Sequence, residues 1–123
     1  GMPTARDSLS TLLKKVHSDE SQFRFLVRER HGGVAEVRRA IATELLLFSR
    51  ELAIDLARIP ALTQWGADDL EVAADLIVSI MMTTVAELLD GDGREATERA
   101  LVERAEKQLV MVFLGMTQWK PSQ

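Results

Sequence analysis

The sequence has no cysteine and no tyrosine, few aromatic residues, and only 3 prolines among its 123 residues. Without cysteine the chain can form no disulfide framework, no cysteine-ligated zinc or iron–sulfur site, and no cysteine nucleophile. It also lacks a basic surplus, since 15 Lys+Arg face 19 Asp+Glu and the formal net charge is −4. Nucleic-acid-binding domains normally carry excess positive charge, so we do not expect this chain to bind DNA directly.

Long apolar runs and a leader segment are missing as well. No uninterrupted apolar run approaches the 18 or more residues of a membrane-spanning helix. The chain does not open on the charged segment and apolar core of a secretory signal. We therefore expect a cytoplasmic protein with no membrane partner. Gly1 before Met2 is typical of the scar left by tag removal, with Met2 as an alternative natural start.

What the sequence does contain is helical periodicity between a few breaks. Apolar residues recur every three or four positions, as in the series Val37, Ile41, Leu45 and Phe48, and this spacing is that of a helix. Glycine and proline cluster between such segments and end them. No segment alternates with period two, so an all-α fold with no strand is expected. The predicted helices cover residues 4–17, 19–30, 34–58, 68–90 and 93–119, within one domain spanning 3–120.

The last two predicted helices are apolar nearly all round near residues 76–82 and 109–116. Such helices must be buried on every side, and a five-helix domain cannot enclose two of them. We therefore predict a twofold homodimer sealed by a four-helix bundle, with two helices from each subunit and Gly115 allowing close approach. The alternative is that one of the two is simply a central core helix. The predicted interface residues are Leu76, Ile80, Leu109, Val112, Phe113 and Met116.

No constellation for catalysis or metal binding is recognisable. His17 and His31 lie near predicted helix C-termini, where a positive charge is favourable. No histidine pair has metal-binding spacing on a helix, and the glycines at 91 and 93 form a turn instead of a phosphate loop. We predict no catalytic residue, no metal and no cofactor. A small helical enzyme stays as an alternative, and its candidate residues would be Arg24, Arg28, Arg38 and Glu44.

One stretch carries a family resemblance. The segment Phe23-Arg-Phe-Leu-Val-Arg-Glu-Arg-His-Gly-Gly33, followed by Ala35-Glu-Val-Arg-Arg-Ala-Ile-Ala-Thr-Glu-Leu45, resembles the ligand-binding half of TetR-family repressors. The resemblance is closest to repressors of bacterial unsaturated fatty-acid synthesis. Leu89-Asp90, Gln108-Leu109 and Trp119 match further features, so that the resemblance extends over about residues 4–120.

The resemblance implies a homodimeric five-helix TetR-type regulatory domain that is not an enzyme. Its last two helices would form the interface, and a small hydrophobic ligand such as a fatty acyl-CoA would lie between helices. The helix-turn-helix domain of such repressors is not found in this sequence. An alternative is a dimerisation or adaptor domain with a filled core and no ligand. The expected tunnel residues are Phe25, Leu45, Phe48, Leu52, Met81 and Val85.

Three arginines are candidates for the phosphates of a CoA-like ligand, because the guanidinium group suits phosphate geometry. They are Arg24, Arg28 and Arg30, and the first two share a helix face at a spacing of four. The alternative is that the Arg28-Glu29-Arg30 sequence pairs within the chain and tethers its short helix.

Overall fold

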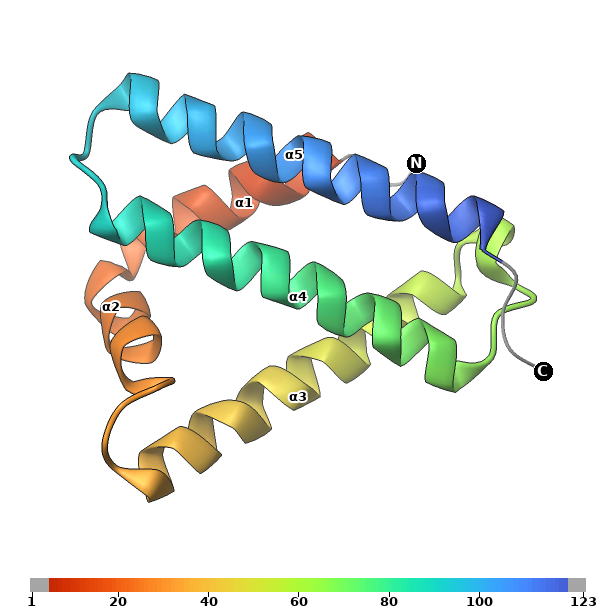
Figure 1. The fold of residues 1–123 in the computed structure, drawn as a ribbon, viewed down its shortest axis with the longest axis horizontal. Helices are drawn as coiled ribbons and strands as arrows, with labels where there is room; N and C mark the ends of the chain where they lie inside the picture. Colours follow the sequence, from red (N-terminus) through yellow and green to blue (C-terminus); the bar gives the residue numbers. More distant parts are fainter. Residues whose placement is uncertain (1–4, 120–123) are drawn as a thin grey trace.

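A computed structural model describes residues 5–119, and within this range every regular element is a helix (Figure 1). The all-α prediction with five helices is therefore confirmed. The predicted start of the first helix at residue 4, the Gly1–Met2 segment and the expected domain limits at 3 and 120 lie outside the described residues. The helices are α1 (Ala5–Ser18), α2 (Glu20–Glu29), α3 (Ala35–Ala57), α4 (Ala67–Asp90) and α5 (Glu95–Gln118).

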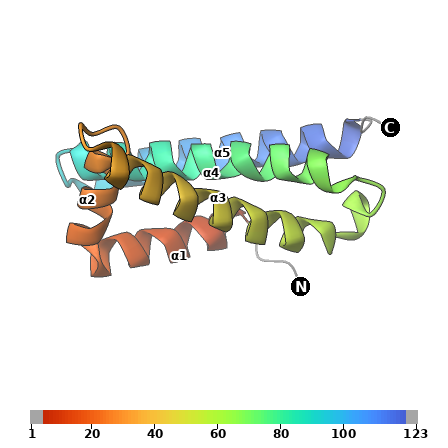
Figure 2. The ribbon, with the colours of Figure 1, turned by 90° about the horizontal axis from the view of Figure 1, so that it is seen from below.

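Helix α4 is the central element, because it contacts all four of the other helices. It packs most extensively against α3 and α5, while α1 lies on the side away from the viewer of Figure 1. Figure 2 shows α4 and α5 as one layer, α1 as a second, and α3 running between the two levels. Helices α4 and α5 are antiparallel, and an ion pair of 2.9 Å between Arg104 Nη2 and Glu87 Oε1 joins them near their connecting turn.

The main core cluster lies where the end of α3 meets the start of α4 and the end of α5. Burial of one leucine or methionine side chain contributes about 1.5–3 kcal/mol to the free energy of folding. The cluster is therefore the main stabilising contact at this end of the fold. Its fully or nearly buried members are Ala53, Leu56, Leu62, Leu70, Ala73, Ala74 and Met116.

The connection between α3 and α4 is more ordered than the sequence predicts. Pro60 begins a single 3₁₀ turn, η1 (Pro60–Leu62), where the sequence indicated only an irregular loop after the proline. Proline suits this first position because its fixed φ is already helical and its missing N–H has no partner to lose. The turn places Leu62 inside the core with no exposed surface.

Helix α4 is long and apolar enough to cross a membrane by length and composition, which differs from the expectation of no such segment. The core helix of a soluble protein meets the same criterion. About a third of its most apolar window is buried within the chain. The other residues of that window are not buried by the other helices of this chain.

The turn between α4 and α5 depends on glycine at one position. Gly93 has a φ of +72°, in the left-handed region, where a side chain is strained. We expect Gly93→Ala to lower the free energy of unfolding by about 1 kcal/mol, measured by urea denaturation. Gly33→Ala is the matched control, because a Cβ at Gly33 meets no atom within 4 Å and its φ is not positive. An equal loss in both variants would contradict this explanation.

Candidate ligand pocket and dimer face

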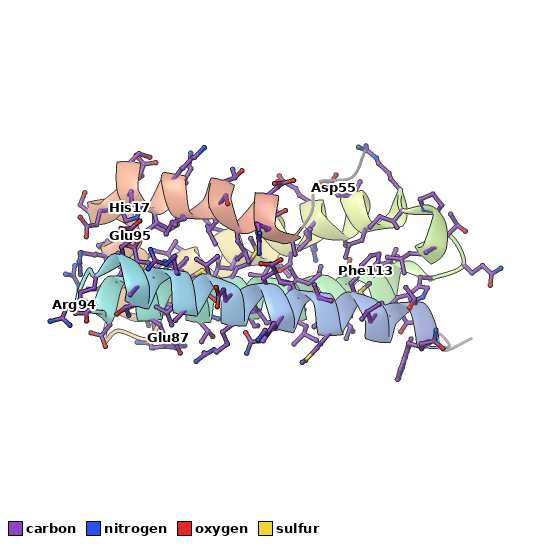
Figure 3. All side chains as sticks on the ribbon, turned by 90° about the horizontal axis from the view of Figure 1, so that it is seen from above. His17, Asp55, Glu87, Arg94, Glu95 and Phe113 are labelled. Carbon is purple, nitrogen blue, oxygen red and sulfur yellow. The ribbon has the colours of Figure 1, made fainter. Side chains whose placement is uncertain are left out.

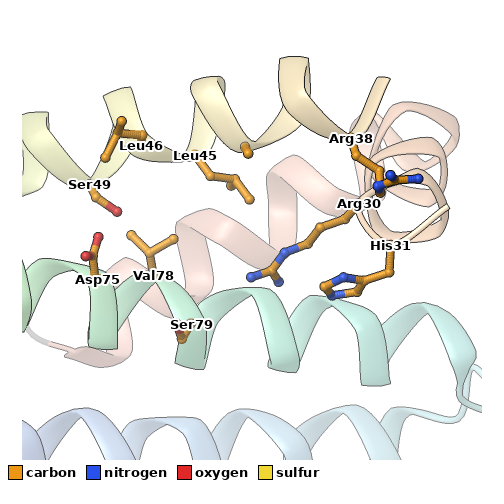
Figure 4. A pocket seen from close by; sticks show the side chains of 10 residues that line it. Arg30, His31, Arg38, Leu45, Leu46, Ser49, Asp75, Val78 and Ser79 are labelled. Atoms are coloured by element: carbon orange, nitrogen blue, oxygen red, sulfur yellow. The ribbon is translucent and has the colours of Figure 1, made fainter. Parts of the chain in front are cut away.

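A pocket of about 470 Å³ opens between α3 and the middle of α4, and the loop after α2 closes one end of it (Figure 4). Three elements contribute to it, so it forms only in the folded chain. The lining residues are Arg30, His31, Arg38, Ala42, Leu45, Leu46, Ser49, Asp75, Val78 and Ser79.

One end of the pocket is cationic. Arg38 Nη1 donates a hydrogen bond of 2.5 Å to the carbonyl oxygen of Gly32, which fixes the loop that follows α2. Arg30 is half-buried and extends into the space between α3 and α4, and His31 lies beside it (Figure 4). Within the described part of the chain, the Arg30 guanidinium makes no ion pair and no hydrogen bond.

The opposite end carries acceptor groups. Ser49 is a buried polar residue of α3, and its hydroxyl points toward the Asp75 carboxylate on α4 (Figure 4). Ser79 follows one helical turn after Asp75 and lies on the same side of α4. Between the two ends, the walls are apolar and are formed by Ala42, Leu45, Leu46 and Val78. The pocket is thus polarised along its length, with positive charge at one end and negative charge at the other.

The structure places one of the six expected tunnel residues, Leu45, at this pocket. Phe25 and Phe48 are about half exposed, Val85 is buried, and Leu52 packs against the core cluster. Met81 is half-buried and does not line the pocket. Phe25, Phe48, Leu52 and Val85 are likewise absent from the pocket lining. The six side chains therefore do not form one cavity.

Two of the three candidate phosphate-binding arginines are engaged within the chain. Arg24 pairs with Glu20 at 2.9 Å and donates a hydrogen bond of 3.1 Å to the Leu89 carbonyl oxygen. Arg28 pairs with Glu29 at 2.9 Å, and its guanidinium carbon lies 5.8 Å from the centre of the Phe25 ring. Only the hydrogen bond from Arg24 to the Leu89 carbonyl oxygen joins α2 to another helix, since Arg28 pairs with its own sequence neighbour.

The polar pocket residues other than Arg30 had no ligand role in the sequence interpretation. Asp75 and Ser79 are polar residues four apart in an otherwise apolar stretch of α4, and this pattern was a usable signal. His31 and Arg38 flank the glycine pair that ends the α2 segment. Their convergence depends on the path of that loop, which the sequence pattern does not specify.

A smaller hollow of about 160 Å³ lies where the α1–α2 junction meets the α4–α5 turn. His17 Nε2 lies 3.3 Å from Glu98 Oε1 at its edge, and this contact links α1 to α5. At the other end of α1, Arg6 Nε lies 3.2 Å from Glu106 Oε2. The hollow is therefore lined by groups that hold α1 in place, which is a structural role.

A second surface is apolar and uncovered. We name it the α4–α5 apolar face and define it by five side chains that remain at least 43% exposed: Val72, Leu76, Val110, Met111 and Leu114. Figure 3 shows that Glu87 and Arg94 lie at the turn end of the α4–α5 pair and Phe113 toward the opposite end. Exposed carboxylates at the start of α4, including Asp68 and Glu71, border the apolar face at the end where Phe113 lies.

The predicted interface residues divide between this face and the interior. Leu76 belongs to the face, and Ile80, Leu109 and Phe113 are half-buried beside it. Val112 packs against the core cluster, and Met116 is only 5% exposed inside it. Met116 was therefore assigned to the wrong side of α5, because a helix that is apolar all round gives no signal for its own orientation.

Gly115 lies beside this face on exposed backbone. A Cβ built at Gly115 meets no atom within 4 Å, so no contact within the chain explains why the position is glycine. Glycine in the interior of a helix is destabilising by roughly 0.5–1 kcal/mol relative to alanine. An approach by a second helix remains a physical reason for glycine here.

Comparison with known families identifies the fold. Residues 4–116 match the family described as tetracyclin repressor-like, C-terminal domain. The chain belongs to this family. TetR-type regulatory domains of this kind typically dimerise and bind small molecules, and the family is not generally enzymatic. In residues 5–119 of this TetR-type domain, no group of three His, Asp or Glu side chains is placed to hold a metal ion.

Proposed function

We propose that this TetR-type domain is the cytoplasmic, homodimeric sensor of a transcriptional repressor and binds a small hydrophobic effector, such as a fatty acyl-CoA, in the α3–α4 pocket. The observation that supports this proposal most directly is the double role of α4. Asp75, Val78 and Ser79 line the pocket, while Val72 and Leu76 lie on the α4–α5 apolar face. Neighbouring residues of one rigid helix thus belong to both surfaces.

This arrangement gives a route from ligand to dimer. A ligand shifts an equilibrium only if it binds two conformations with different affinity. A ligand between α3 and α4 changes the position of α4 relative to α3, and α4 carries half of the proposed interface. The geometry of the two subunits then depends on pocket occupancy, and a DNA-binding part of a repressor responds to that geometry. This chain, with its formal net charge of −4, is not expected to contact DNA itself.

The homodimer follows from the uncovered apolar residues. Monomeric proteins rarely expose a contiguous apolar patch unless it has a binding role. The α4–α5 apolar face contains the most exposed apolar side chains of both helices. A twofold axis places the same patch on both sides of the contact, so one apolar face covers the other.

The acyl-CoA suggestion combines the pocket with the resemblance of the segment Phe23–Gly33 to fatty-acid-responsive repressors. Arg30 offers an unpaired guanidinium at one end of the pocket, and arginine suits phosphate and carboxylate groups. Ten methylene groups of an acyl chain buried in the pocket would contribute about 8 kcal/mol to the binding free energy, at about 0.8 kcal/mol each. The entropy lost when ligand and side chains become ordered is subtracted from this value.

Thermal unfolding with decanoyl-CoA and palmitoyl-CoA tests ligand binding. A ligand at a hundred times its Kd stabilises the folded state by about 2.7 kcal/mol, which is roughly 10 °C in Tm for a domain of this size. We expect Ala42→Trp, which fills the pocket from an exposed position, to abolish this shift. Ala57→Trp, also exposed on α3 but outside the pocket, is the matched control.

The results separate the alternatives. Absence of any shift with either acyl-CoA would contradict an acyl-CoA effector. A shift that survives in Ala42→Trp would place the ligand elsewhere in the molecule.

A further inference from the structure

The two ends of the α3–α4 pocket carry opposite charge, and the ligand must satisfy both. At the cationic end, Arg30 is half-buried and has no partner within the described part of the chain. A guanidinium withdrawn from water normally has an anionic partner, because loss of hydration is otherwise uncompensated. Arg24 and Arg28 on the same helix both have one. Within the described residues Arg38, half-buried at the same end, also has no carboxylate partner and donates only to the Gly32 carbonyl oxygen, so this end of the pocket offers two guanidinium groups to an anionic group on the ligand.

The acceptor end sets a second requirement. Asp75 is exposed and makes no ion pair within residues 5–119, and the Ser49 hydroxyl points toward it (Figure 4). A plain hydrocarbon end placed here would remove water from Asp75 without replacing its hydrogen bonds, which is unfavourable. A hydroxyl or amino group at that end of the ligand would donate to the carboxylate instead.

The dimensions limit the length of the ligand. Along α3, the lining extends from Arg38 to Ser49, which is about 16 Å at a rise of 1.5 Å per residue. The volume of about 470 Å³ holds roughly fifteen groups of the size of a water molecule. The apolar walls at Leu45 and Val78 lie between the two polar ends. A molecule of medium chain length spans this distance, whereas a CoA nucleotide would have to remain outside.

We propose that the pocket takes a medium-length amphiphile with an anionic head at Arg30 and a hydrogen-bond donor at its far end, facing Asp75. This inference rests on the proposed function and specifies the ligand class of the same site. The anionic head is the carboxylate of a free acid, because the CoA nucleotide, which carries the phosphates of an acyl-CoA, would remain outside the pocket. An ω-hydroxy acid of about ten carbons has the required shape.

Calorimetric titration with four probes tests the proposal: decanoic acid, 10-hydroxydecanoic acid, 1,10-decanediol and decanoyl-CoA. We expect 10-hydroxydecanoic acid to bind about tenfold more tightly than decanoic acid, because it adds a hydrogen bond to a charged group. Asp75→Leu should remove this preference. Asp68→Leu, on the exposed first turn of α4 outside the pocket, should retain it.

The anionic head is tested by Arg30→Gln, which should weaken binding of both acids about 10- to 100-fold through loss of a charge-assisted hydrogen bond. Binding of the neutral diol should not change. Arg39→Gln is the control, since Arg39 is exposed and lies outside the pocket lining. We expect decanoyl-CoA to bind less tightly than decanoic acid, and the reverse order would contradict the free carboxylate as the anionic head.

Two kinds of failure can be distinguished. If the acids bind but neither the terminal hydroxyl nor Arg30 affects their Kd, the polarised site is overturned while ligand sensing remains. If none of the four probes binds the unsubstituted protein, and the acyl-CoA series gives no thermal shift, the sensor itself is contradicted.

Discussion

Leu76→Glu is expected to convert the proposed dimer to a monomer while leaving the fold of each chain intact. Leu76 is 50% exposed on α4 and lies within the α4–α5 apolar face. In a twofold dimer both subunits carry the substitution, so two glutamates lie at one interface. Each lost leucine contact removes about 1.5–3 kcal/mol of apolar burial, so we expect Kd to rise about 100- to 10,000-fold. Glutamate is a good helix former, which protects α4 itself.

Sedimentation velocity measures the oligomeric state, and circular dichroism measures whether the helical fold is retained. The matched control is Ile54→Glu, because Ile54 is 58% exposed on α3, away from the proposed interface. We expect the control to keep the sedimentation coefficient of the unsubstituted protein. If Leu76→Glu also sediments unchanged, the α4–α5 apolar face does not join two subunits. A loss of helical signal in Leu76→Glu would show instead that Leu76 supports the monomer.

The largest effect on stability is expected from Leu62→Ala. Leu62 has no exposed surface, and η1 holds it among the core residues of α3, α4 and α5. Truncation of a buried leucine to alanine lowers stability by about 2–5 kcal/mol, since the removed atoms leave a cavity. Domains of this size are stable by only about 5–15 kcal/mol in total. We therefore expect Tm to fall by roughly 8–20 °C.

Thermal unfolding at one fixed protein concentration measures this effect, because the Tm of an oligomer depends on concentration. Leu47→Ala is the matched control, since Leu47 is about half exposed on α3. Its expected effect is within about 0.5 kcal/mol. A similar fall in both variants would mean that the 3₁₀ turn does not anchor the core.

The helices could be predicted from the sequence because their boundaries depend on local chemistry. Pro60 ends α3, and Gly91 and Gly93 separate α4 from α5. Proline ends a helix because its φ is fixed and it has no backbone N–H to donate, and glycine allows a turn because it adopts a positive φ. Neighbouring residues do not override these effects. The 3₁₀ turn at Pro60–Leu62 was missed because three residues are too few for a periodic pattern.

The orientation of the helices was harder to predict than their extent. Helix α5 carries apolar residues on all sides near residues 109–116, so the sequence does not distinguish its core side from its outer side. Met111 and Met116 differ by about 140° around the helix. Met116 enters the core, whereas Met111 is 69% exposed. Only the packing of η1 and α4 against α5 decides between them.

The pocket residues were likewise predictable only in part. Arg30 and Leu45 were singled out from the sequence, and both line it. Phe25 and Phe48 were expected in the tunnel because they lie on the third and fourth predicted helices or face them, but they are about half exposed and do not line the pocket. Pocket membership depends on how far two helices diverge and on the path of the loop at 30–34. Neither quantity follows from periodicity.

Sedimentation equilibrium of the unsubstituted protein over a dilution series tests the central claim most directly. If the α4–α5 apolar face joins two subunits, the mass will be twice the 13.7 kDa of the chain at micromolar concentration, as for stable interfaces of standard size. A mass of one chain at every concentration up to about 100 µM, which corresponds to only about 5–6 kcal/mol of association, would contradict the dimer and the ligand response that depends on it.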